Sequence, residues 1–321
     1  MNYKKITVAG SGVLGSQIAF QTAFKGFDVT IYDIDDKALA VGREKIAALA
    51  GIYESEIRRA EVGYEKASVS IQYNKNLLPN LDDMLSAQIG SVIRMVEGLS
   101  SKIAFTSDLA AAVADADLVI EAIPEQMKIK TDFYTKISTL APEKTVFATN
   151  SSTLLPSMFA SCTGHPDRFL ALHFANEIWR NNTAEIMGHS GTSETVYNDT
   201  VEFAEAIGMV PLKLKKEQPG YILNSILVPF LDAAQSLLLN DVADIETIDA
   251  TWKLATGAPF GPFQILDVVG IRTAYNILKN YADTSGDPDS EYARMAAMLK
   301  ENYLDKGHTG VAAGEGFYKY N

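Results

Sequence analysis

Residues 6–15 read Ile6-Thr7-Val8-Ala9-Gly10-Ser11-Gly12-Val13-Leu14-Gly15. An apolar strand pattern here runs into the spacing G-x-G-x-x-G, and residues 16–20 continue in helical register. In such a unit the first glycine permits the tight turn, the second lets the backbone approach a pyrophosphate, and the third lets the helix pack closely on the strand. The helix N-terminus then faces the anion. We therefore expect a dinucleotide site at Gly10, Gly12, Val13, Leu14 and Gly15.

A second strand pattern follows the glycine turn and ends at Asp33. An acid about 20 residues beyond such a turn accepts a hydrogen bond from the ribose 2′-hydroxyl. Its charge would repel a 2′-phosphate, so Asp33 favours NAD over NADP. The alternative interpretation is a glycine turn in a sheet without a cofactor, with Asp33 a solvated residue at the end of a strand.

Short apolar runs recur at residues 29–32, 103–106, 118–122, 146–149, 169–174 and 184–187, and helix-like segments separate most of them. Buried strands that alternate with amphipathic helices indicate a parallel sheet with helices on both faces. We expect an α/β, Rossmann-type doubly wound, mostly parallel sheet. Residues 35–101 interrupt the rhythm with a long stretch rich in Ala, Glu, Lys and Arg, which predicts a helical insertion.

The strand pattern stops after Leu214, and a polar stretch leads to Pro219-Gly220. This punctuation predicts a domain boundary, with residues 1–215 forming the nucleotide-binding domain and residues 216–321 a smaller, all-helical domain. Residues 222–239 are strongly apolar but carry Pro229 and several polar side chains. They predict a kinked, buried helix.

Composition narrows the class of function. The 321 residues carry a formal net charge of -12, which disfavours a nucleic-acid binder because such binding relies on neutralising phosphates. The single cysteine, Cys162, excludes an intrachain disulfide and a cysteine metal cluster, so we expect no metal and a cytoplasmic location. Neither an export signal nor a membrane span is predicted.

His173 is the candidate catalytic base. It ends the apolar run 168–173, and the carboxyl ends of strands are where open α/β sheets bind ligands. Glu185, an acid within the apolar run 184–187, needs a partner that an imidazole at a neighbouring strand end would supply. The segment Asn150-Ser151-Ser152-Thr153 follows another strand. The alternatives are a structural histidine and a helix cap at the serines, while a hydrolase is disfavoured because no serine lies in a G-x-S-x-G elbow.

At this point the chain closely resembles the 3-hydroxyacyl-CoA dehydrogenase family over nearly its whole length. The resemblance rests on GSGVLG at 10–15, VIEAIPE at 119–125, NSS at 150–152, DRF at 167–169, HF at 173–174, PGYILN at 219–224, GPF at 261–263 and GEGFY at 314–318. It implies that His173 is the general base, that Glu185 orients it, and that Ser152 and Asn224 hydrogen-bond the reacting oxygen. It also implies that Glu125, Lys130 and Asn150 contact the cofactor, the first two on the nicotinamide side.

The resemblance further implies hydride transfer from C3 of a (3S)-3-hydroxyacyl-CoA to NAD, a small-molecule reaction of fatty acid metabolism. Because Asn224 lies beyond the predicted boundary, the helical domain would complete the active site. The same domain offers more apolar surface than about 100 residues readily bury, and we expect it to form a homodimer.

One segment departs from the family pattern. Where the family continues with a largely apolar run, residues 175–182 read Ala-Asn-Glu-Ile-Trp-Arg-Asn-Asn. Glu177, Trp179 and Arg180 leave room for two alternatives. One is a dehydrogenase of a non-CoA hydroxy acid such as a sugar acid, and the other is a dehydrogenase of a cationic, carnitine-like substrate held by Trp179 and an acid. A non-enzymatic, crystallin-like or NAD-sensing protein is a third class, which Ser152, His173, Glu185 and Asn224 argue against.

Overall fold

The computed structural model describes residues 1, 3–61, 77–78, 84 and 86–320. The chain divides into two compact units, Met1–Ile222 (unit 1) and Leu223–Asn321 (unit 2). Each unit has its own hydrophobic core. The division falls a few residues after the predicted boundary between residues 215 and 216, beyond the Pro219-Gly220 turn.

The described residues of unit 1 contain an eight-stranded sheet with the order β3-β2-β1-β4-β5-β6-β7-β8. The strands are β1 Lys5–Ala9, β2 Asp28–Tyr32, β3 Ala104–Thr106, β4 Leu118–Glu121, β5 Val146–Thr149, β6 Phe169–Phe174, β7 Thr183–Gly188 and β8 Val210–Lys213. Neighbours are parallel except for β6 and β7, which are antiparallel. The predicted mostly parallel α/β sheet is confirmed, and β8 adds an edge strand that the apolar runs did not indicate.

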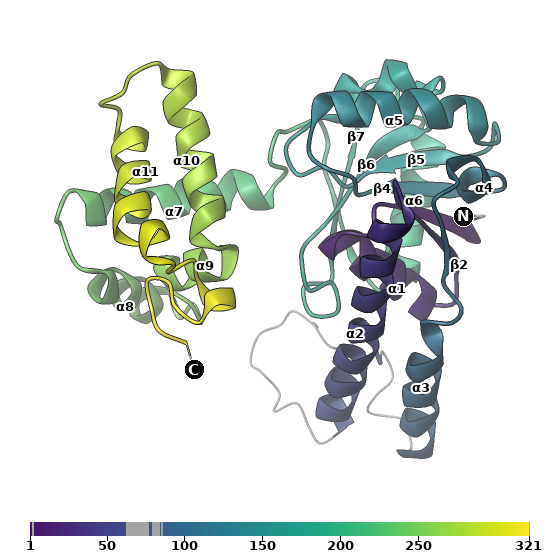
Figure 1. Ribbon diagram of the computed structural model, residues 1–321, viewed down its shortest axis with the longest axis horizontal. Helices are drawn as coiled ribbons and strands as arrows, with labels where there is room; N and C mark the ends of the chain where they lie inside the picture. Colours follow the sequence, from purple (N-terminus) through teal and green to yellow (C-terminus); the bar gives the residue numbers. More distant parts are fainter. Residues whose placement is uncertain (2, 62–76, 79–83, 85, 321) are drawn as a thin grey trace. The chain divides into compact units, whose positions relative to one another are not determined.

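Helices cover both faces of this sheet (Figure 1). They are α1 Val13–Phe24, α2 Asp36–Glu61, α3 Ser86–Leu99, α4 Leu109–Val113, α5 Met127–Leu140 and α6 Glu194–Ala206. Alternate residues of β4 point to opposite faces of the sheet and belong to different hydrophobic cores. Leu118 and Ile120 lie in the core that includes α1, α2, α3 and α6, whereas Val119 lies in the core that includes α4 and α5. A strand buried on both faces reads as a continuous apolar run, which explains the sequence pattern.

The predicted insertion at residues 35–101 contains α2 and α3, which run side by side (Figure 1). Ile46, Leu49, Tyr53 and Ile57 follow helical spacing on one face of α2 and are buried in the same core as α3. Within the insertion, residues 62–76, 79–83 and 85 lie outside the described part of the chain.

Unit 2 is helical, as predicted, apart from two isolated bridges near its end. Its α-helices are α7 Leu223–Leu239, α8 Ile245–Thr256, α9 Pro262–Val269, α10 Ile271–Ser285 and α11 Glu291–Asn302. Pro229 lies inside α7. Buried Asp249 accepts hydrogen bonds from the backbone N–H groups of Phe263 and Gln264 and so satisfies the first turn of α9. Among the described residues, none of the helices is long and apolar enough to cross a membrane.

Candidate active site

The glycine turn between β1 and α1 is packed so closely that two of its positions exclude a side chain. Gly10 has φ +106°, and a Cβ there would lie 2.5 Å from the carbonyl oxygen of Ala122. A Cβ on Gly15 would lie 2.0 Å from the carbonyl oxygen of Gly10. At Gly12, the N-cap of α1, a Cβ would meet nothing within 4 Å. The open space therefore lies beside the helix N-terminus, where a phosphate binds.

A cavity of about 210 Å³ begins at this turn. Its lining residues are Gly12, Val13, Leu14, Gly15, Ala122, Ile123, Glu125, Lys130, Asn150 and Ser152. The cavity thus brings together the turn and the polar residues that follow β4 and β5. The lining fits a dinucleotide, because the backbone of the glycine turn and several charged and hydroxyl side chains face the same cavity.

Asp33 follows β2 and interacts with the same turn. Its carboxylate accepts hydrogen bonds from the backbone N–H and the hydroxyl of Ser11, at 2.7 and 2.5 Å. Its other oxygen accepts from the N–H of Ile34 at 2.8 Å. A carboxylate has about four acceptor positions, so one remains for a ribose hydroxyl.

We predict that NAD binds more tightly than NADP and that Asp33→Ala weakens NAD binding by about 10- to 100-fold, the cost of losing a hydrogen bond to a charged group. NADP binding should become tighter, because the lost charge repelled its 2′-phosphate. Titration of both cofactors measures this, with Asp28→Ala at the opposite end of β2 as the control. Equal or tighter binding of NADP by the unmodified protein would overturn the assignment of Asp33.

His173 and Glu185 are paired by the sheet itself. They are register partners in the antiparallel β6–β7 ladder, and Nδ1 of His173 lies 3.1 Å from Oε2 of Glu185. Oγ of Ser152 lies 3.2 Å from Nε2 of the same ring. Because an ionised carboxylate only accepts, it favours the tautomer with the proton on Nδ1, which leaves Nε2 as the acceptor facing Ser152. His173 and Glu185 are both buried.

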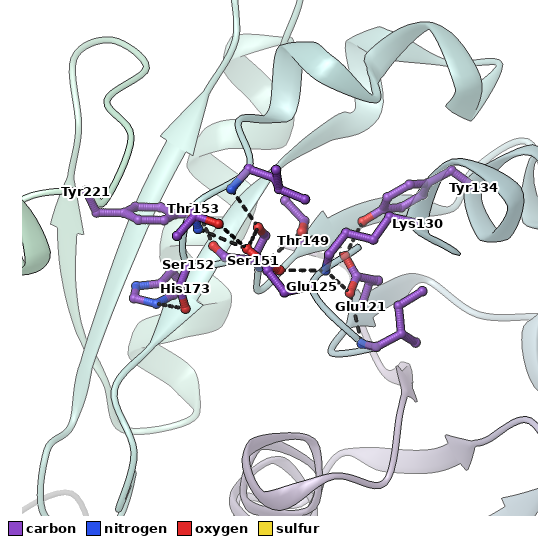
Figure 2. A network of polar contacts seen from close by, with 12 residues as sticks. Glu121, Glu125, Lys130, Tyr134, Thr149, Ser151, Ser152, Thr153, His173 and Tyr221 are labelled. Atoms are coloured by element: carbon purple, nitrogen blue, oxygen red, sulfur yellow. Dashed lines mark hydrogen bonds and ion pairs between the residues drawn. The ribbon is translucent and has the colours of Figure 1, made fainter. Parts of the chain in front are cut away.

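Tyr221 closes this group on one side (Figure 2). Its ring stacks on the imidazole of His173, with centroids 4.4 Å apart and planes at 13°. Its hydroxyl donates to the carbonyl oxygen of Ser151 at 2.7 Å, and the N–H of Ile222 donates to Oε1 of Glu185 at 2.8 Å. Burial, with the charges of Glu125 and Glu185, raises the pKa of the Tyr221 hydroxyl well above its usual range, so this group stays a donor.

Glu121 anchors a second polar cluster that the sequence interpretation missed. This fully buried carboxylate accepts from Nζ of Lys130 at 2.5 Å, the hydroxyls of Tyr134 and Thr149 at 2.9 and 2.8 Å, and the N–H of Ile123 at 2.9 Å. The signal was present in the sequence, because an acid that ends an apolar, buried strand needs partners. The same reasoning had singled out Glu185.

Lys130 connects this cluster to Glu125 through an ion pair of 3.2 Å. Glu125 in turn accepts from the hydroxyl of Ser151 and from the N–H and hydroxyl of Thr153. Burial acts to raise the pKa of the Glu125 carboxyl, but the hydrogen bonds from Ser151 and Thr153 and the charge of Lys130 outweigh it and hold the pKa below its ordinary value. The turn that carries Ser152 is therefore held from the β4 side by a chain of charge-assisted contacts.

The two predicted asparagines, Asn150 and Asn224, lie in different units. Asn150 lines the cavity, and its side-chain oxygen accepts from the N–H of Phe174 at 3.0 Å. Asn224 belongs to unit 2, as the second residue of α7, and its action together with Ser152 and His173 stays a prediction.

The role considered for Trp179 is wrong. Its side chain is buried in the core beside Tyr53, so it offers no open aromatic face to a cationic substrate. Arg180 is paired with the buried carboxylate of Glu56 at 2.6 Å and with Glu177 at 3.6 Å. The polar segment therefore ties the β6–β7 connection to α2. The loop composition was misleading because Ile178 and Trp179 turn inward, whereas Asn176 and Glu177 stay exposed.

Comparisons with known proteins identify the family of the chain. The family described as "3-hydroxyacyl-CoA dehydrogenase, NAD binding domain" matches residues 5–89 and 90–218, and "3-hydroxyacyl-CoA dehydrogenase, C-terminal domain" matches residues 220–320. The mitochondrial hydroxyacyl-coenzyme A dehydrogenase of Rattus norvegicus is 32% identical over 317 residues, covering 99% of this chain and 91% of that protein. A probable 3-hydroxybutyryl-CoA dehydrogenase of Bacillus subtilis is 30% identical over 320 residues, covering 100% of this chain and 98% of that protein.

Among solved structures, one described as a diketoreductase that acts on dicarbonyl compounds is 50% identical, with a TM-score of 0.83 and complete coverage of both chains. The (S)-3-hydroxybutyryl-CoA dehydrogenase of Ralstonia eutropha, at 24% identity and a TM-score of 0.76, has the same fold and also covers both chains completely. With the glycine turn, the cavity and both family domains in place, the chain belongs to the 3-hydroxyacyl-CoA dehydrogenase family and is an NAD-dependent oxidoreductase.

Proposed function

We propose that the protein interconverts a (3S)-3-hydroxyacyl-CoA and its 3-oxoacyl-CoA, with His173 as general base. The observation that carries this proposal is the chain of contacts Glu185–His173–Ser152, whose last member lines the cavity that starts at the glycine turn. When bound, NAD supplies the hydride acceptor. The family relatives are dehydrogenases of CoA esters by name, which supports this substrate class.

The residues divide the proton chemistry among them. As the C3–H bond breaks and its hydride leaves, the substrate hydroxyl proton passes to Nε2 of His173 and the C3–O bond becomes a carbonyl. The carboxylate of Glu185 stabilises the imidazolium that forms, and its second oxygen is already held by the N–H of Ile222. Ser152 hydrogen-bonds the reacting oxygen, and we assign the same role to Asn224 of unit 2.

A second candidate is the reduction of a dicarbonyl compound without CoA. It is favoured by the 50% identity to the diketoreductase structure over the whole chain, which exceeds the identity to the CoA dehydrogenases. The two candidates share the reacting β-hydroxycarbonyl group and differ in what is attached to it.

Steady-state assays that follow NADH absorbance separate these candidates. We expect kcat/KM for acetoacetyl-CoA to exceed that for a β-dicarbonyl ester by at least about tenfold, because binding energy from the remote CoA group supports catalysis. The reverse order would assign the dicarbonyl reaction. A protein that binds NADH but turns over neither compound, nor carnitine or a sugar acid, would contradict both candidates.

We further propose that unit 2 forms a homodimer. Several large apolar side chains on α7–α9 and the connections between them are more than half exposed, namely Ile226, Val242, Leu254, Phe260 and Val268. Apolar surface of this extent commonly marks an interface. Light scattering should give a mass of about twice the chain mass of 34.9 kDa. The double substitution Leu254→Glu and Val268→Glu should lower the measured mass towards that of one chain. A monomer at micromolar concentration would contradict the proposal.

We also propose that the protein works in a reducing compartment, the cytoplasm, because Cys162 is the only cysteine in the sequence.

A further inference from the structure

Tyr221 is held in a conformation that the backbone does not favour. Its φ is +56°, in the left-handed region that residues with a Cβ seldom adopt. It follows Gly220, which also has a positive φ of +77°. Such a conformation persists only where surrounding contacts maintain it, and it is concentrated at functional sites. The contacts here include the stack on His173, the hydrogen bond to Ser151, and packing against Ala171 and Met187.

These contacts make Tyr221 and Ile222 a clamp on three parts of the site. The Tyr221 ring covers a face of the imidazole, its hydroxyl holds the carbonyl of the residue before Ser152, and the N–H of Ile222 holds the oxygen of Glu185 that His173 does not use. Tyr221 is 1% exposed, so its ring excludes water from that face of the imidazole. Figure 2 shows the two rings lying nearly parallel beside Ser152.

We infer that Tyr221 is a positioning residue for the reaction, whose ring fixes and stabilises the imidazolium form of His173 and whose hydroxyl fixes the Ser152 turn. An aromatic face attracts a cation, most strongly where water is excluded. A planar cation stacked on the ring gains this attraction and keeps its edge nitrogens free for Glu185 and Ser152. The inference rests on the proposed role of His173 as the base.

The charges around His173 set the direction of the expected pH effect. Glu185 on β7 contacts Nδ1, Ser152 after β5 contacts Nε2, and Tyr221 covers a face. Lys130, with Glu121 and Glu125, lies on the other side of Ser151 (Figure 2). Removing the ring removes a group that favours the protonated form. The acidic limb of the pH profile should therefore move to lower pH.

Two substitutions separate the ring from the hydroxyl. Tyr221→Leu should lower kcat by about 10- to 100-fold, through loss of alignment, and shift the acidic limb of kcat/KM down by about 0.5–1.5 pH units. Tyr221→Phe keeps the stack, so it should leave the limb in place and lower kcat about threefold to tenfold through the freed Ser151 carbonyl. Neither should change the Kd for NADH more than about twofold, because Tyr221 does not line the cavity.

Tyr197→Leu is the matched control. Like Tyr221, Tyr197 has a hydroxyl that donates to backbone carbonyls, those of Ile186 and Leu214, at 3.1 and 3.2 Å, although its side chain is only partly buried. The Tyr197→Leu substitution should lower Tm without moving the acidic limb of the kcat/KM profile. If Tyr221→Leu does the same, with kcat and the limb unchanged, Tyr221 is a packing residue and the inference is wrong.

A fluorinated series covers the case in which Tyr221→Leu does not fold. Phenylalanine carrying one, two or three ring fluorines at position 221 keeps the shape while progressively weakening the ring's attraction for a cation. The NMR titration of the His173 imidazole should move to lower pH with each fluorine, whatever the activity. An unchanged titration would overturn the inference alone, whereas normal turnover by His173→Gln would overturn the proposed base.

Discussion

Replacement of His173 by Gln is expected to lower turnover by about 10²- to 10⁴-fold, the usual contribution of a general base. Gln has a similar size and hydrogen-bonding capacity, but it cannot accept the substrate proton at position 173. NAD affinity should change little, because the cavity lining does not include His173. Tm should also change little, because Gln keeps the size and the hydrogen-bonding capacity of the side chain. Steady-state kinetics, cofactor titration and thermal unfolding of the one variant test all three expectations.

Glu185→Gln should also lower turnover, because a neutral amide stabilises the imidazolium less than a carboxylate does. The double variant should be less impaired than the product of the single effects, since the two side chains act together. His189→Gln is the control, as this histidine of unit 1 bonds the carbonyl of Pro166 instead. If His173→Gln loses several kcal/mol of stability but retains turnover, His173 is structural.

Replacement of Lys130 by Met is expected to lower the free energy of unfolding by about 3–5 kcal/mol. The substitution would leave Glu121, with an exposed fraction of 0%, without its cationic partner. An uncompensated charge in the interior costs far more than the lost packing, since Met nearly fills the same space. Denaturant unfolding in the absence of cofactor measures the effect.

The control lies on the same helix. Lys128 pairs with Asp132, but its side chain is 86% exposed, so Lys128→Met should change stability by less than about 1 kcal/mol. Adding Glu121→Gln to Lys130→Met should recover part of the loss, because it removes the orphaned charge. Equal stability of the Lys130→Met and Lys128→Met proteins would contradict the account of the buried pair.

Much of the fold followed from local patterns. The glycine turn, the apolar runs of β1, β4, β5 and β6 and the isolated acid Glu185 are all visible within a few residues of sequence. Each reflects a local rule, namely backbone sterics at Gly10 and Gly15, burial of parallel strands on both faces, and the cost of burying a lone charge.

What the sequence did not indicate depends on contacts between distant residues. Side-chain partners of Glu121 come from α5 and β5. The pattern of apolar residues within one helix or strand does not predict that these side chains meet. Tyr221 contacts His173 only because a left-handed turn brings it back to the sheet. Trp179 lies in a segment of polar composition, yet its exposure is set by packing against α2.

The antiparallel pairing of β6 and β7 determines which positions of the connection can change without disturbing the His173–Glu185 pair. His173 and Glu185 face each other because the backbone ladder pairs them, and a slip of two residues would place Met187 or Thr183 opposite the histidine. The ladder holds this register together with Ile178 and Trp179 of the connection, which lie in the core. Substitutions at the exposed positions Asn176, Glu177 and Asn181 would therefore leave the pairing of His173 with Glu185 in place.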